Sequence, residues 1–74
     1  MSKYGVILFH TTSSVMMAEK TLLKANLSIK IIPTPRQFSS DCGISIRFIW
    51  NDGAEIKYLL AEDRVAYGAV HPLQ

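Results

Sequence analysis

Cys42 is the residue of this sequence best suited to covalent chemistry. It is the only cysteine among 74 residues, and its thiolate form is a strong nucleophile. A single cysteine excludes an intrachain disulfide and any zinc or iron–sulfur site built from the cysteines of one chain. The sequence therefore predicts no metal site and no cofactor. It predicts a lone thiol that stays reduced in the cytoplasm.

Residues near position 10 and around Cys42 are candidates for supporting roles. Hydroxyl side chains follow His10 and are able to cap a helix, whose N-terminal amides stabilise an anionic sulfur. Arg36 adds a cation in the loop that leads to Cys42, and Gly43 suits a tight turn after it. The supporting candidates are His10, Thr11, Thr12, Arg36, Ser40 and Gly43.

Each of these residues also has a purely structural explanation. Cysteine is among the most buried residue types and often acts as a small hydrophobe. His10 also fits a histidine at the end of a strand. The polar loop around Cys42 favours an accessible thiol. A Cys42–His10 pair acting as nucleophile and base would need a substrate cleft, for which 74 residues leave little room. An enzyme is therefore the less favoured interpretation.

Hydrophobic periodicity predicts the elements that position these residues. Residues 44–50 give the clearest alternation of apolar and polar side chains. Asn26 fits a left-handed residue that ends the first helix, and Asp52 with Glu55 fits a capping box at the start of the second. The predicted elements are strands at 4–9, 28–32, 44–50 and 66–70, the last ended by His71-Pro72, a helix at 14–25 and a helix opening at Asn51-Asp52-Gly53.

The element order β-α-β-β-α-β predicts an α+β fold, with residues 1–74 as a single domain. Two helices with one apolar stripe each are buried most simply against one face of a four-stranded antiparallel sheet. Right-handed crossovers favour the ferredoxin-like two-layer sandwich with strand order 4-1-3-2. Two hairpins with loosely packed helices form the weaker alternative.

This topology brings Cys42 close to residues that are distant in the sequence. The first two strands run one way and the last two the other. The end of the first strand, the start of the first helix and the loop before the third strand therefore share one end of the sheet. Strand alternation places Cys42 on the helix-covered face with Ile44 and Ile46. We expect His10 and the first amides of the helix to lie near Cys42.

Charge and hydropathy exclude several classes of partner. Eight basic and six acidic residues give a net charge of +2, and the basic residues form no run and no stripe interleaved with aromatic residues. A mixed surface with no nucleic-acid partner is expected. The apolar run at residues 4–9 is too short for a signal-peptide core or a membrane span. No membrane contact is expected, and the predicted location is cytoplasmic.

The face of the sheet away from the helices is the expected site of self-association. The strand at residues 4–9 is apolar on both faces, and Ile32 and Ile49 are expected on the uncovered face. An exposed apolar patch of this kind usually marks an interface. The sequence therefore predicts a homodimer through this face.

Four segments of the chain are similar to segments of a known family. The similarity runs from about Tyr4 to Val70 without gaps, and Pro-Thr-Pro-Arg followed by Ser-Ser-X-Cys-Gly is its most specific part. The segments are Leu8-Phe9-His10-Thr11-Thr12, Ile32-Pro33-Thr34-Pro35-Arg36, Ser39-Ser40-Asp41-Cys42-Gly43 and Ile46-Arg47-Phe48. The chain resembles the selenium/sulfur carrier protein-like family of small bacterial domains.

The resemblance implies a small carrier, at most sulfurtransferase-like, that holds sulfur or selenium as a persulfide or perselenide on Cys42. The implied donor is a cysteine desulfurase or a selenocysteine lyase. The implied acceptor is selenophosphate synthetase or another sulfur-transfer protein. Two other classes stay open. One is a ferredoxin-like binding or regulatory module, and the other is a thiol redox sensor that is oxidised reversibly.

Overall fold

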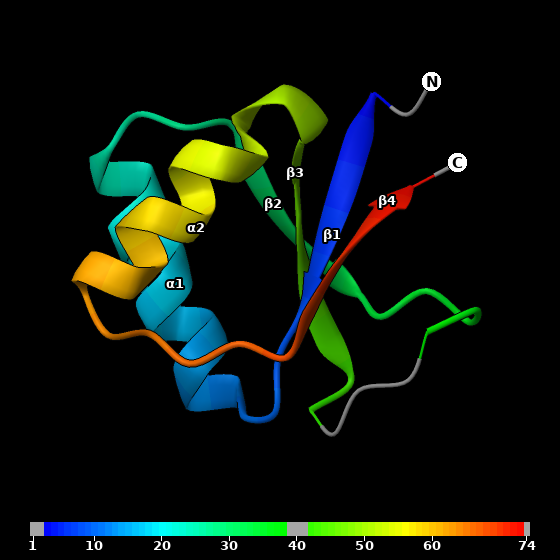
Figure 1. The fold of residues 1–74 in the computed structure, drawn as a ribbon. Helices are drawn as coiled ribbons and strands as arrows, with labels where there is room; N and C mark the ends of the chain where they lie inside the picture. Colours follow the sequence, from blue (N-terminus) through cyan, green and yellow to red (C-terminus); the bar gives the residue numbers. More distant parts are fainter. Residues whose placement is uncertain (1–2, 39–41, 74) are drawn as a thin grey trace.

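The computed structural model describes residues 3–38 and 42–73, whose elements form two layers. One layer is a four-stranded sheet, and both α-helices cover one face of it (Figure 1). The α+β two-layer sandwich predicted from the sequence is therefore confirmed. In chain order the elements are β1 (Tyr4–Leu8), α1 (Thr12–Lys24), β2 (Ile29–Pro33), β3 (Ile44–Ile49), the 3-10 turn η1 (Trp50–Asp52), α2 (Gly53–Glu62) and β4 (Ala69–Leu73).

β1 lies in the middle of the antiparallel sheet and sets its register. It pairs with β3 on one side and with β4 on the other, and β2 pairs with the far side of β3. The order is β2-β3-β1-β4, which runs β4-β1-β3-β2 when it is read from the opposite edge. Ile7 lies opposite both Ile46 and Val70. Because side chains alternate along a strand, this register decides which residues face the helices.

The hydrophobic core fills the space between the sheet and the helices. Ile7, Ile46 and Phe48 face the helices from the sheet and are at most 1% exposed. Each helix buries one apolar stripe, as predicted, at three- and four-residue spacing in α1 and at four-residue spacing in α2. The buried helical residues are Val15, Ala18, Leu22, Ile56 and Leu60. Across residues 3–38 and 42–73, neither helix is long and apolar enough to cross a membrane.

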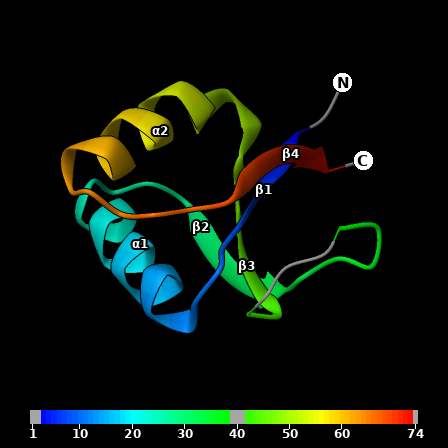
Figure 2. The same cartoon turned by 60° about the horizontal axis from the view of Figure 1, so that its bottom comes forward.

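The second face of the sheet, which carries Val6, Leu8 and Ser45, is covered in part by the loop that joins β2 to β3. Figures 1 and 2 both place this loop on the side of the sheet opposite the helices. Phe38 of the loop stacks on His71 of β4, with ring centroids 4.4 Å apart and ring planes 8° apart. Val6 and Ser45 are fully buried. The loop thus reduces the apolar area open to a second copy, and the homodimer remains a prediction.

The ends of α1 follow from local capping chemistry. Thr11 is the N-cap residue, and its Oγ1 accepts a hydrogen bond from Ser14 N at 3.1 Å. The helix therefore begins earlier than the predicted Ser14. At the other end Asn26 has a φ of 62°, and Leu27 N donates to Leu22 O at 3.1 Å. This bond is part of a Schellman motif, so the left-handed residue predicted at Asn26 is confirmed.

The start of α2 differs from the prediction. Asp52 occupies the N-cap position, but its side chain accepts no hydrogen bond from the first turn of the helix. The chain enters α2 through η1, so Asp52 has φ −87° and ψ 1° and lacks the extended backbone of a capping residue. The predicted capping box of Asp52 and Glu55 is wrong. The other end of α2 repeats the Schellman pattern, with Arg64 at a φ of 55° and Val65 N donating to Leu60 O at 2.8 Å.

β4 lies later in the chain than the sequence predicts. The predicted strand at 66–70 ended at His71-Pro72, whereas β4 spans Ala69–Leu73 and contains both of these residues. β4 pairs only with β1, so it is an edge strand, where the missing N–H of Pro72 is tolerated. The preceding residues do not enter the sheet ladder, since Val65 packs into the core. The predicted boundary of the last strand is therefore wrong.

Candidate functional site

Cys42 lies just before β3, at the end of the sheet where β1 also ends. Gly43 follows it with a φ of 74°, a left-handed conformation that glycine adopts at the least cost. Gly43 O accepts a hydrogen bond from Thr34 N at 3.0 Å, which joins the two ends of the β2–β3 connection. The predicted turn at Gly43 is confirmed, and it fixes the backbone that carries Cys42.

The Cys42 thiol is half-buried and faces backbone oxygens. Its Sγ lies 3.2 Å from Ile44 O and 3.5 Å from Phe9 O, and the side chain packs against the edge of the core. Phe9 follows β1 directly, so the predicted approach of this chain segment to Cys42 is confirmed. Carbonyl oxygens are acceptors, and the S–H group donates toward them. A nucleophilic attack therefore requires Sγ to lose its proton and turn away from these carbonyls.

The hydroxyl residues that follow β1 cap α1. Thr11 Oγ1 accepts from Ser14 N at 3.1 Å and donates to Ser14 Oγ at 3.0 Å. The Ser14 amide, one of the donors expected near Cys42, is thus bonded to Thr11. Thr12 is exposed at the first position of α1. The N-terminus of α1 lies at the same end of the sheet as the start of β3 (Figure 1). Roles for Thr11 and Thr12 toward the thiol remain predictions.

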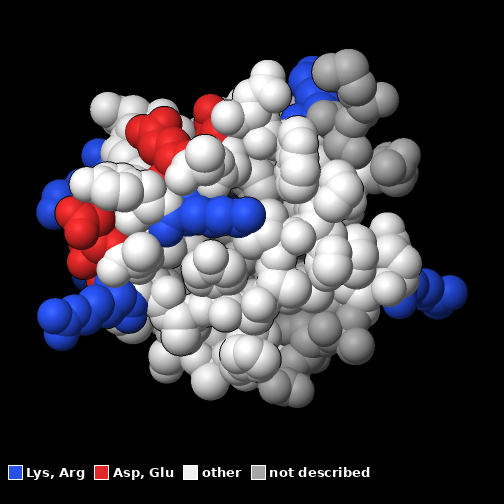
Figure 3. Space-filling model, in the orientation of Figure 1, with Lys and Arg blue, Asp and Glu red and all other residues white. Residues whose placement is uncertain are grey.

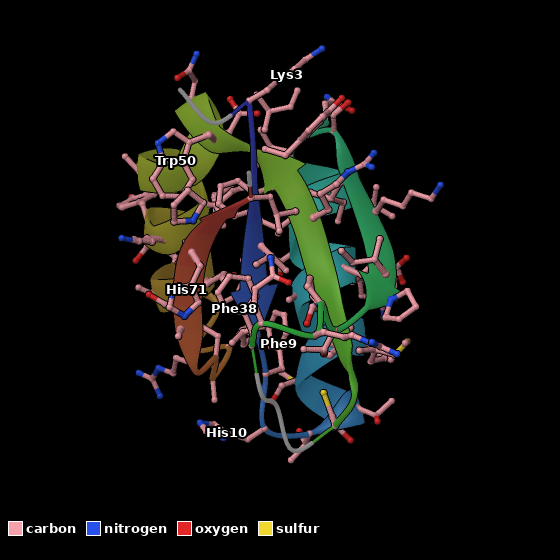
Figure 4. The ribbon with its side chains drawn as sticks, turned by 90° about the vertical axis from the view of Figure 1, so that its right-hand side faces the viewer. Lys3, Phe9, His10, Phe38, Trp50 and His71 are labelled. Atoms are coloured by element: carbon pink, nitrogen blue, oxygen red, sulfur yellow. The ribbon has the colours of Figure 1, made fainter. Side chains whose placement is uncertain are left out.

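His10 lies at this end of the sheet, and its ring lies close to Gly68, in the segment that precedes β4. A Cβ added at Gly68 would lie 3.4 Å from His10 Nε2. The Gly68 backbone is itself joined to β1, because Gly68 N donates to Leu8 O at 2.7 Å. Figure 4 shows the exposed His10 side chain beyond Phe9, at the end of the sheet. Assistance of the thiol by His10 remains a prediction.

The other predicted site residues belong to the connection between β2 and β3. Arg36 is exposed on this loop, while Ser40 lies outside the described residues. In the part of the chain that the structure describes, no three His, Cys, Asp or Glu side chains are grouped so that they could hold a metal ion. Among the predicted side chains, the thiol of Cys42 and the imidazole of His10 lie at this end of the sheet, and a role for Arg36 toward the thiol remains a prediction.

Two contacts that the sequence did not reveal hold the loop on the second face. Thr34 Oγ1 and Ser45 Oγ share a hydrogen bond of 2.8 Å, and Ser45 is fully buried. Phe38 stacks on His71, as Figure 4 shows from the side of the second face. In the sequence, the sign that Phe38 makes such a contact is its aromatic side chain within an otherwise polar loop. Its partner could be identified only once the register of β4 was known. Both contacts anchor the chain that leads to Cys42.

Comparison with known proteins identifies the family of the chain. No curated protein and no solved structure matches it. The model of the family described as "Putative Se/S carrier protein-like" matches residues 4–72, a range that begins with β1, includes Cys42 and reaches into β4. This match covers nearly all of the described residues and agrees with the resemblance seen in the sequence. The chain therefore belongs to the Se/S carrier protein-like family.

Proposed function

We infer that this protein is a carrier that holds one sulfur or selenium atom on Cys42. Family membership supports the inference, because the family is described by this role. The observation that carries it is the position of the only cysteine. Cys42 lies half-buried at one end of the sheet, next to the left-handed turn at Gly43. A carrier needs a thiol that a partner can reach but that is not fully open to solvent.

The loading step transfers one chalcogen atom without a net oxidant. The Cys42 thiolate, formed by loss of its proton to water, attacks the outer sulfur of a persulfide on the donor. The S–S bond of the donor breaks, its cysteine leaves as a thiolate, and a new S–S bond forms at Cys42 Sγ. Unloading is the same exchange with Cys42 as the leaving group. Transfer of selenium from a donor perselenide balances in the same way, since one S–Se bond breaks on the donor and one S–Se bond forms at Cys42 Sγ.

The absence of a second cysteine in the sequence favours a carrier over an internal redox switch. A persulfide on Cys42 has no other thiol in the chain to resolve it into a disulfide. The adduct therefore persists until a partner attacks it.

The expected donor is a cysteine desulfurase or a selenocysteine lyase. The expected acceptor is selenophosphate synthetase or another sulfur-transfer protein. The sheet order supports a ferredoxin-like scaffold for this site.

The Sγ contacts suggest how the unloaded thiol is protected. The S–H group donates toward Ile44 O and Phe9 O, which holds Sγ against the edge of the core. An extra sulfur or selenium atom lengthens the side chain and replaces S–H with S–S or S–Se. The loaded side chain then extends away from the two carbonyls. Loading thus moves the reactive atom toward solvent, where an acceptor can attack it.

Loading can be tested by intact-protein mass spectrometry. The protein is incubated with a cysteine desulfurase and cysteine, or with a selenocysteine lyase and selenocysteine. We expect a gain of one sulfur or one selenium atom, which mild reductant removes and which the Cys42→Ser variant does not acquire. Alkylation of Cys42 by a small reagent serves as the control for access. A protein that is alkylated readily but stays unmodified with either donor would contradict the proposal.

A further inference from the structure

The charges that are scattered along the sequence are separated by layer in the structure. Every acidic residue that the structure describes belongs to the helical layer. These residues are Glu19 of α1, Asp52 of η1, Glu55 and Glu62 of α2, and Asp63 at the end of α2. Figure 3 shows acidic side chains gathered over the helices in this view. The described residues of the strands contribute only basic side chains, so the sheet layer is locally cationic.

Two of these cations face each other across the sheet. Lys30 of β2 lies directly opposite Arg47 of β3, and both are on the second face because Ile31 and Ile46 face the helices. Like charges directly opposite one another on neighbouring strands are destabilising. In the described part of the chain, no acidic side chain forms a salt bridge with either of them. This pair has an unneutralised charge that an anion would relieve.

Tyr4 holds the guanidinium of this pair in position. Arg47 Cζ lies 4.5 Å from the centroid of the Tyr4 ring, and Lys3 Nζ lies 5.5 Å from the same centroid. Both distances are within the range of cation–π interactions. A guanidinium held against a ring in this way has less freedom to lose when it binds an anion. Two cations, Lys3 and Arg47, thus lie against one aromatic ring, and Lys30 lies opposite Arg47 on the next strand.

A groove beside this cluster provides space for a ligand. It has a volume of about 230 Å³, and its lining includes Tyr4, Ser28, Lys30, Arg47 and Ile49. Pockets for drug-sized ligands measure roughly 300–1,000 Å³, so this groove accommodates a small group rather than a large ligand. Its lining offers an ammonium, a guanidinium and a hydroxyl. All three are hydrogen-bond donors that suit an oxyanion.

We propose that this groove binds the phosphate group of a small phosphorylated molecule. A phosphate monoester carries close to two negative charges near neutral pH, which matches the two opposed cations. A carboxylate brings only one charge. The planar fork of Arg47 fits two phosphate oxygens, Lys30 supplies a second charge, and the Ser28 hydroxyl donates to a third oxygen. When phosphate is bound, Lys30 and Arg47 are both attracted to it, and this attraction offsets the repulsion between the two cations.

This site is separate from the proposed carrier site. Cys42 precedes the first residue of β3, whereas Arg47 and Ile49 lie in its second half. Phosphate binding therefore requires no chemistry at Cys42, and the Cys42→Ser variant should bind phosphate as the wild type does. A failure of the carrier proposal would leave this proposal untouched, and the reverse also holds.

The site can be tested by NMR titration of the isotope-labelled protein with inorganic phosphate, glycerol phosphate and acetate at matched ionic strength. Both phosphates should give saturable shifts of the amides at residues 28–30 and 47–49. Lys30→Gln should weaken this binding about tenfold, the value of one charge-assisted hydrogen bond. Lys30 is exposed, so this variant is expected to fold. Lys57→Gln, which removes an exposed cation from α2, is the matched control.

Three results would overturn the proposal. The first is an equal response to acetate and phosphate, which would show only general charge screening. The second is equal weakening by Lys30→Gln and Lys57→Gln. The third is the absence of saturable shifts with either phosphate. Thermal unfolding gives an independent readout, because a ligand that binds only the folded state raises the melting temperature as its concentration rises. Phosphate should raise it more than sodium chloride does at the same ionic strength.

Discussion

Two backbone carbonyl groups lie close to the Cys42 thiol. Its Sγ lies within 3.5 Å of the carbonyl oxygens of Ile44 and Phe9. Gly43, with its positive φ, turns the chain so that the residue after it can supply one of these oxygens. The site therefore depends on the exact path of the backbone between the loop and β3. The approach of Phe9 to Cys42 follows from the pairing of β1 with β3.

Gly5 of β1 is the residue least able to accept a side chain. A Cβ at this position would lie 2.5 Å from the Phe48 ring and 2.6 Å from the Trp50 ring. These two rings stack with centroids 6.0 Å apart, and Phe48 is 1% exposed in the core, where a shift of its ring is costly. We expect Gly5→Ala to lower the free energy of unfolding by about 1–3 kcal/mol, as overpacking of a core does. Denaturant unfolding followed by Trp50 fluorescence measures the change.

Gly53→Ala is the matched control for this prediction. A Cβ at Gly53 would lie 3.6 Å from the same Phe48 ring, an ordinary contact. Gly53 has helical angles, φ −56° and ψ −43°, so alanine suits its backbone. The free energy of unfolding should stay the same or rise by up to about 1 kcal/mol. Similar losses for the two variants would contradict the assignment of Gly5 as a close-approach glycine.

Among the elements, those that local chemistry determines were predicted well from the sequence. The alternation in β3 and the left-handed residue Asn26 depend on neighbours along the chain, and both were confirmed. The start of β4 and the entry into α2 depend on tertiary contacts instead. Val65 packs into the core, and η1, which ends at Asp52, precedes α2. No local pattern in the sequence reports such contacts, so these boundaries could not be predicted.

The end of α2 offers a test of the helix-end geometry. Arg64 has a φ of 55°, a left-handed conformation that costs a non-glycine residue about 1–2 kcal/mol. Arg64→Gly should therefore raise the free energy of unfolding by about 0.5–1 kcal/mol, after the greater entropy of the unfolded glycine is subtracted. Lys57→Gly, inside α2, should instead lower it by about 1 kcal/mol. Thermal or denaturant unfolding of both variants measures these changes. A loss of stability in Arg64→Gly as large as that in Lys57→Gly would oppose the prediction.

The loop between β2 and β3 should control access to Cys42. An aromatic stack such as that of Phe38 on His71 contributes about 0.5–1.5 kcal/mol. Its loss in Phe38→Ala should raise the population of the opened loop by up to about tenfold. Alkylation of Cys42 should then be several-fold faster. Tyr58→Ala, which removes an aromatic ring that is 63% exposed on α2, should leave the rate unchanged. An unaltered rate in a folded Phe38→Ala variant would exclude this role of the loop.

At the scale of the whole molecule, the two faces of the sheet differ in how they are covered. The helices cover one face and bury its central residues Ile7, Ile46 and Phe48, while the loop covers the second face only in part. The sequence predicted the apolar residues of both faces. It did not predict the fold-back of the loop, because Phe38 and His71 are distant along the chain. The separation of charge by layer was not visible in the sequence for the same reason, since the basic and acidic residues are scattered along the chain.

Self-association through the remaining part of the second face can be measured by analytical ultracentrifugation. Ile32 lies on this face, opposite Ser45, and is only partly buried. We expect a reversible homodimer at high micromolar concentration, weakened at least several-fold by Ile32→Lys, because a charge in an apolar contact is costly. Leu23→Lys, at a 52% exposed position on α1, is the control. A wild-type monomer at these concentrations would show that the loop already covers enough of the face.

The most direct test of the central claim is transfer from Cys42 to an acceptor. The protein is loaded with sulfur or selenium, separated from its donor, and mixed with a selenophosphate synthetase or a sulfurtransferase. Intact masses of both proteins are then followed over time. The account predicts that the acceptor gains the atom that Cys42 loses, without added reductant, and that the alkylated protein transfers nothing. An adduct that only reductant removes, with no gain by any acceptor, would contradict the carrier function.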